Sequence, residues 1–165
     1  MTVSDEFFLR RAIALAIEGR ERGSDPFGAV LVKDGQIVRE TFDRCVETSD
    51  PTFHAELSLI SDHCRENQLF ALPGYALYAS TEPCPMCAGA IHWSRIARLV
   101  FSVSQAMLQE RSGGSPKLSC DVVLDRNRIE IIGPLLPDEG LKVFDGYAFV
   151  PKIERHRRRF NDLTP

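Results

Sequence analysis

The chain has 165 residues, of which 44% are hydrophobic and 26% charged, a balance typical of one soluble globular domain with a buried core. A formal net charge of -3 and an isoelectric point of about 5.8 argue against a general nucleic-acid binder, although they leave room for a local basic patch. No apolar run approaches the roughly 20 residues of a membrane span, and the acidic start MTVSDEFFLRR is unlike a secretory leader. We therefore expect a cytoplasmic protein without membrane partners.

Hydrophobic periodicity and turn signals predict alternating helices and strands. In chain order, we expect a helix over 6–22, strands over 27–34 and 36–42 joined by a hairpin at Asp34-Gly35, a loop over 43–53, a helix over 54–68, a strand over 76–81, a helix over 84–95, a strand over 97–103, a loop over 111–116, a strand over 128–132, a short helix within 138–149 and a basic tail over 154–160. This order predicts an α/β layered fold with a mixed sheet.

The stretch TEPCPMC places Cys84 and Cys87 three residues apart at an expected helix start. A helix beginning there puts both sulfurs on one side of its first turn, and the helix N-terminus favours their thiolate forms. Pro85 suits the first helical position, where its missing N–H costs nothing. Because the chain has five cysteines, an odd number, and no leader, a disulfide framework is not expected. Thiolates are preferred zinc ligands, so the spacing indicates a zinc site.

A third ligand is available upstream in the tripeptide HAE, also at an expected helix start. The His54 imidazole would complete a set of three protein ligands, which leaves the fourth zinc position open as in catalytic sites. Glu56, two residues on, is well placed to take a proton from water and pass it to a leaving nitrogen. Together the two motifs form H-x-E followed by P-C-x-x-C, the signature of zinc nucleobase deaminases.

The segments DPFGAVLVKDG, DPTFHAE and TEPCPMCAGAIHWSRI, within about 26–103, resemble the cytidine deaminase superfamily, on the branch that contains guanine deaminases and tRNA adenosine deaminases. The resemblance implies a three-layer α/β/α fold with a mixed five-stranded central sheet, in a single domain over 1–165. It also implies one zinc per active site, a homodimer, and hydrolytic replacement of a ring amino group by oxygen. Under this resemblance His54, Cys84 and Cys87 are the ligands, Glu56 is the proton shuttle, and the Ala55 backbone contacts substrate.

The resemblance favours guanine as substrate, because AIHWSR carries Trp93 where guanine deaminases have a tryptophan, and because the C-terminal tail over 146–165 would suit an active-site cover. The basic run at 155–159 fits the alternative, a tRNA adenosine deaminase. Both subfamilies usually place a base-reading Asn where this chain has Asp43. A carboxylate only accepts hydrogen bonds, so Asp43 would favour a ring face that presents N–H donors.

Structural interpretations stand beside these functional ones. Cys84 and Cys87 could form a redox pair, or a structural zinc site completed by Cys64 or His63. Such a non-catalytic zinc-stabilised scaffold would have no need of Glu56. Phe27 is a candidate for stacking on a base but could equally be core. Dimer packing is the alternative for Trp93, and loop capping is the alternative for Asp43.

Overall fold

The computed structural model describes residues 3–113 and 117–161. Its helices are α1 (Val3–Glu21), α2 (Cys45–Thr48), α3 (Ala55–Asn67), α4 (Pro85–Trp93), α5 (Gln105–Ser112), α6 (Pro137–Lys142) and α7 (Lys152–Asn161), with a single 3-10 turn, η1 (Cys120–Val122), among the described residues. Its strands are β1 (Gly28–Lys33), β2 (Gln36–Phe42), β3 (Tyr75–Thr81), β4 (Arg98–Val103) and β5 (Glu130–Ile132). None of the described helices combines the length and apolar character that crossing a membrane requires.

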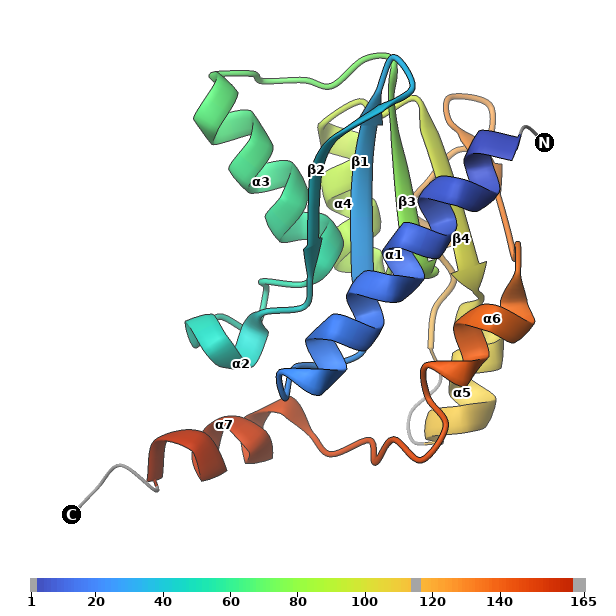
Figure 1. The fold of residues 1–165 in the computed structure, drawn as a ribbon. Coiled ribbons are helices and arrows are strands. Elements are labelled where there is room, and N and C mark those ends of the chain that lie inside the picture. Colours follow the sequence, from blue (N-terminus) through green and yellow to red (C-terminus); the bar gives the residue numbers. More distant parts are fainter. Residues whose placement is uncertain (1–2, 114–116, 162–165) are drawn as a thin grey trace.

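The five strands form one mixed sheet in the order β2-β1-β3-β4-β5 (Figure 1). β1 is antiparallel to both β2 and β3, whereas β3, β4 and β5 run parallel. The Asp34-Gly35 turn joins β1 to β2, and both of its residues adopt positive φ, as a tight hairpin requires. The predicted mixed five-stranded sheet is confirmed.

Helices cover both faces of the sheet, which confirms the three-layer prediction. Alternate strand residues divide between the two faces: Leu31 packs in the cluster that contains α3 and α4, while its neighbour Val30 packs against α1. α1 crosses β1 so closely that a side chain at Gly28 would meet the Ala12 carbonyl oxygen at 2.3 Å. Glycine at this position therefore permits the contact between helix and sheet.

Two short helices, α2 and α5, were not predicted. α2 lies inside the expected loop over 43–53, and α5 follows β4 directly, where Ser104 caps the helix by accepting a hydrogen bond from the Met107 backbone N–H at 3.2 Å. The expected loop over 111–116 is in part the end of α5, and its residues 114–116 lie outside the described residues. The basic tail forms α7, which packs beside α2 at one end of the molecule (Figure 1).

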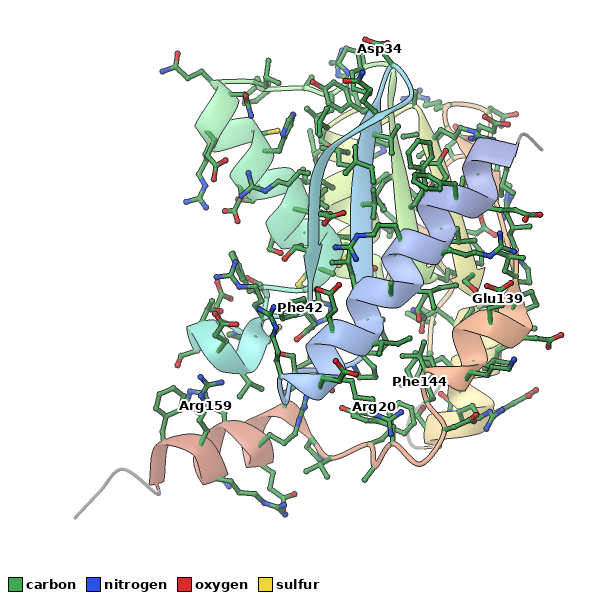
Figure 2. All side chains as sticks on the ribbon, viewed as in Figure 1. Arg20, Asp34, Phe42, Glu139, Phe144 and Arg159 are labelled. Atoms are coloured by element: carbon green, nitrogen blue, oxygen red, sulfur yellow. The ribbon has the colours of Figure 1, made fainter. Side chains whose placement is uncertain are left out.

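The C-terminal segment follows the surface of the same chain before it reaches α7. Arg20 of α1 donates to the Val143 carbonyl at 2.7 Å, and Figure 2 shows Arg20 and Phe144 near each other at this junction. Figure 2 also places Asp34 at the hairpin end and Arg159 of α7 at the opposite end. The end that carries α7 is also where α3 and α4 begin, so the tail reaches the edge that holds the sequence motifs (Figure 1).

Candidate active site and metal centre

The HAE and PCPMC motifs both lie at helix starts, as the sequence predicts. His54 and Cys84 are the capping residues of α3 and α4, each with extended backbone angles. Their carbonyls accept the first helical hydrogen bonds, from Ser58 at 2.9 Å and from Ala88 at 2.8 Å. α3 and α4 pack against each other on one face of the sheet, so the two N-termini present their side chains to a common point.

The structure brings His54, Cys84 and Cys87 together. Their potential ligand atoms all lie within 4.8 Å of one another, and the Cys84 sulfur is 3.7 Å from His54 Nδ1. Ligand atoms around a tetrahedral zinc, at about 2.0–2.3 Å from the metal, are roughly 3.5 Å apart. All five cysteines are free thiols, so Cys84 and Cys87 form no disulfide. One imidazole and two sulfurs at this spacing fit zinc.

The protonation of these groups is set by their mutual contacts. A hydrogen bond from the Cys87 thiol is the largest influence on Cys84 and, with the nearby His54, lowers the pKa of Cys84 to about 4 despite burial. The same contact, reinforced by burial, raises the pKa of Cys87 well above its usual value. Burial acts to lower the pKa of His54, but the Cys84 contact and the Glu56 charge outweigh it and raise that pKa. In the absence of metal, these shifts favour a thiolate at Cys84 and a thiol at Cys87.

Glu56 lies beside this donor set, on the first turn of α3, and its residue is only 6% exposed. Burial raises the pKa of its carboxyl above the usual range and outweighs the opposing charge of His54. A raised pKa favours the protonated form, and buried carboxyls of this kind serve as general acids and bases. Glu56 can therefore move a proton at this point.

A cavity of about 410 Å³ opens onto these groups, within the range of small-molecule sites. Phe27, His54, Glu56 and Cys84 line it, as the sequence predicts for residues at the site. Its remaining lining residues are Thr81, Glu82, Pro85, Gln105, Leu108, Lys117, Leu118 and Lys152. Phe27 lines the cavity, and its ring also packs against that of Phe144, with the ring centroids 5.9 Å apart.

The other expected substrate contacts lie differently. Ala55 is fully buried as the first residue of α3, so only its backbone could face a ligand. Trp93 ends α4 with 80% of its surface exposed and borders a separate cavity with His92 and Arg128. The structure thus does not bring Trp93 to the cleft of its own chain. Its exposure agrees with the alternative interpretation, packing against another molecule.

Asp43 is buried and is not among the residues that line the cavity. The residue is 1% exposed, and its carboxylate accepts from the Cys45 backbone N–H at 3.2 Å and pairs closely with the Lys152 ammonium. The expectation that Asp43 itself presents an acceptor to the substrate is therefore revised. The charged group that borders the cavity here is Lys152 of α7.

Sequence reasoning missed two side chains at this site. Lys152 lies 109 residues from its partner Asp43, so no local spacing reveals the pair. Glu82, inside TEPCPMC, lines the cavity and accepts from the backbone N–H groups of Gln105 and Cys120, both at 2.8 Å. Its position directly before Pro83-Cys84 in the sequence could have indicated that Glu82 lies at the site.

The chain is similar in sequence to known deaminases. Guanine deaminase of Bacillus subtilis (strain 168) is 47% identical over 94 residues, which are 56% of this chain and only 60% of the relative's length. A probable cytosine deaminase of Schizosaccharomyces pombe is 34% identical over 157 aligned positions, 89% of this chain and 94% of that protein. A tRNA-specific adenosine deaminase of Aquifex aeolicus is 38% identical over 109 residues, 66% of this chain and 70% of that protein.

Solved structures give the same result. The X-ray structure of guanine deaminase from Bacillus subtilis matches 92% of this chain and 98% of its own, with a TM-score of 0.64 and 32% identity. Residues 2–103, more than half of the chain, match the cytidine and deoxycytidylate deaminase zinc-binding region. With its mixed sheet, paired helix starts and zinc-fitting donor set, the chain belongs to this zinc-binding family of deaminases.

Proposed function

We propose that this protein is a zinc-dependent hydrolytic deaminase of a small nucleobase, with guanine, converted to xanthine and ammonia, as the first substrate to test. The observation that carries the proposal is the buried Glu56 carboxyl beside the donor set of His54, Cys84 and Cys87, on a common cavity. A scaffold stabilised by zinc would need the donor set but not a buried carboxyl facing a cavity.

In this proposal His54, Cys84 and Cys87 hold the zinc ion. Zinc bound there supplies a Lewis acid that makes water nucleophilic near neutral pH. Glu56 takes the proton that water releases as it attacks the amino-bearing ring carbon, and later delivers a proton to the departing ammonia. Phe27 offers an aromatic wall on which a flat ring can stack.

A small substrate is favoured by the position of the tail. Lys152 at the start of α7 borders the cavity, and Arg155 and Lys152 pair with Asp25, so α7 narrows the opening. A cleft of about 410 Å³ with such a rim suits a free base. The similarity to guanine deaminase supports guanine, and the long match to a probable cytosine deaminase makes cytosine the next base to test.

A second candidate, deamination of adenosine in a tRNA anticodon loop, is favoured by one feature of α7. Arg157, Arg158 and Arg159 are exposed on this helix, whose first residue, Lys152, lines the cavity. The similarity to tRNA-specific adenosine deaminases agrees with it. This candidate predicts RNA binding that weakens steeply with salt and depends on these three arginines and on Arg155.

We also propose a cytoplasmic homodimer, as the family resemblance implies. The exposed Trp93 at the end of α4 offers an apolar surface for a second copy. Light scattering of wild type and Trp93→Ala tests this: the variant should shift the mass towards the monomer.

Ammonia release from guanine, cytosine, adenine, their nucleosides, aminotriazines and an anticodon stem-loop tests the substrate. We expect turnover of a free base, with Glu56→Gln lowering kcat by about 10²–10⁴ while zinc content is unchanged. Turnover restricted to the stem-loop would replace the first candidate with the second. No release from any member by the zinc-loaded protein would overturn the deaminase proposal for this panel.

A further inference from the structure

Lys152 begins α7 and inserts its ammonium between groups from two other parts of the chain. Its Nζ pairs with Asp43 Oδ2 and lies 3.2 Å from the Cys45 sulfur and 3.3 Å from Asp25 Oδ2. The Lys152 side chain is 29% exposed, whereas that of Asp43 is 1% exposed. The ammonium therefore lies between a buried acidic wall and the cavity.

This contact determines which group a substrate meets. Asp43 has one oxygen engaged by the Cys45 backbone N–H and the other by Lys152, and it is not among the residues that line the cavity. Lys152 lines that cavity together with His54 and Glu56. Where an acceptor was expected from the sequence, the structure presents a cationic donor.

We propose that Lys152 is a specificity-determining residue that donates a hydrogen bond to the substrate, and that Asp43 positions it. The substrate class is then a base with an acceptor, a ring nitrogen lone pair or a carbonyl oxygen, on the edge that faces α7. This inference rests on the proposed base deaminase. A ring edge that presents an N–H to the ammonium is rejected, because both groups are donors and neither can accept.

The ammonium has a proton to offer. Asp43 is its closest partner, while the contacts with Cys45 and Asp25 are longer, and a thiol is a weak acceptor. Turning one N–H from the sulfur to a substrate nitrogen or oxygen exchanges a weak acceptor for a stronger one. The pairing with Asp43 is kept during this exchange, so the ammonium remains compensated.

Two other roles for this cluster are less well supported. Asp43, Cys45 and His54 also have potential ligand atoms within 4.8 Å of one another, but the Lys152 ammonium contacts two of the three and takes the place of a second cation. Simple anchoring of the tail does not require Lys152 either. Tyr147 donates to Asp25 at 2.5 Å, and another tail residue, Arg155, pairs with the same carboxylate.

The test compares Lys152→Met with Arg155→Met as a matched control. Both variants remove one cationic tail contact with Asp25, but only Lys152 borders the cavity. The double variant Asp43→Asn/Lys152→Met removes the donor without leaving a buried carboxylate unpaired, and so keeps the test valid if the single variant folds poorly. Zinc content is measured for every variant.

The test uses the base that the wild type deaminates fastest, together with analogues that each lack one hydrogen-bond acceptor. In one kind of analogue a ring nitrogen is replaced by C–H, and in the other the carbonyl oxygen is removed. Steady-state kinetics give kcat and KM for each pair. Calorimetry on the inactive Glu56→Ala background gives binding without turnover, so a loss of recognition is separated from a loss of catalysis.

In the wild type, removal of one particular acceptor should weaken binding and kcat/KM by at least about tenfold, as expected for a lost charge-assisted hydrogen bond. Lys152→Met and the double variant should reduce this discrimination to about threefold or less, mainly through KM, whereas Arg155→Met should keep it. If Lys152→Met discriminates against every analogue as strongly as the wild type does, this inference is overturned while the proposed function stands. A wild type inactive on all bases would overturn the proposed function and this inference with it.

Discussion

Glu82 joins three segments at the rim of the cavity, and its replacement should be among the most destabilising at the site. Its Oε2 accepts from the Gln105 backbone N–H at 2.8 Å, at the start of α5. Its Oε1 accepts from Ser119 Oγ at 2.6 Å and from the Cys120 backbone N–H at 2.8 Å. The residue is 6% exposed, so water cannot readily replace these bonds.

The size of the effect follows from these contacts. A hydrogen bond to a charged acceptor contributes about 1.5–3 kcal/mol, and a buried N–H left without a partner costs about 1–3 kcal/mol. Glu82→Ala strands two backbone N–H groups, and we expect a loss of about 3–5 kcal/mol in the free energy of unfolding. Glu82→Gln keeps one oxygen for Ser119 and Cys120 but turns an amide N–H towards Gln105, and we expect about 1.5–3 kcal/mol.

Urea unfolding of the zinc-loaded protein measures both values. With a slope of about 2 kcal/mol/M, Glu82→Ala should lower the midpoint by roughly 2 M. Glu110→Ala on the exposed side of α5 is the control and should change the free energy of unfolding by less than about 0.5 kcal/mol. A loss below about 1 kcal/mol for Glu82→Ala at unchanged slope would refute the view that this carboxylate joins the three segments.

Two further predictions concern the metal site and the core. In protein stripped of zinc, iodoacetamide at pH 6 should alkylate Cys84, because its pKa of about 4 makes it a thiolate at this pH. Cys45 should not react, because burial raises its pKa to about 11. Zinc should protect Cys84, and mass spectrometry measures the alkylation of both cysteines. Gly28→Ala should cost about 1–3 kcal/mol in urea unfolding, because its Cβ would overlap the backbone of α1, whereas Gly89→Ala, with nothing within 4 Å, should be neutral or slightly stabilising.

The sheet and its main helices were predictable because each carries a local signal. The Asp34-Gly35 turn identified the hairpin, and the parallel strand β4 is a buried, mainly apolar run interrupted by Ser102. The short helices lack such periodicity: α2 has only four residues. A serine at 104 was the one local sign of α5, since it caps the helix.

The donor set was also predictable, for a geometric reason. Cys84 and Cys87 share one helical turn, and His54 starts a neighbouring helix, so two local structures and one packing contact bring the three together. The edge of the cavity formed by the tail was not predictable in this way. Lys152 reaches Asp43 because the C-terminal segment follows a path set by long-range contacts, such as that of Arg20 with the Val143 carbonyl. Such contacts cannot be recognised from the spacing of residues in the sequence.

Asp43 nevertheless carried a hint that can be turned into a measurement. A carboxylate that is 1% exposed needs a counter-ion, so a buried Asp43 implies a cation from elsewhere in the chain. If Lys152 is that cation, Lys152→Met alone leaves the carboxylate buried and uncompensated, and should cost about 3–5 kcal/mol in the free energy of unfolding. Asp43→Asn should cost less, because Asp25 still faces the ammonium.

The double variant then decides whether the two positions form one unit. Asp43→Asn/Lys152→Met should recover at least about 1.5 kcal/mol relative to the sum of the single losses, since neither charge is left alone. If the loss in the double variant equals the sum of the single losses to within about 0.5 kcal/mol, the two residues are not coupled. The ammonium would then be compensated by Asp25, and Asp43 would not depend on Lys152 for its burial. A coupled pair would show that Asp43 and Lys152, on two distant segments of the chain, act as one unit at the edge of the cavity that Lys152 lines.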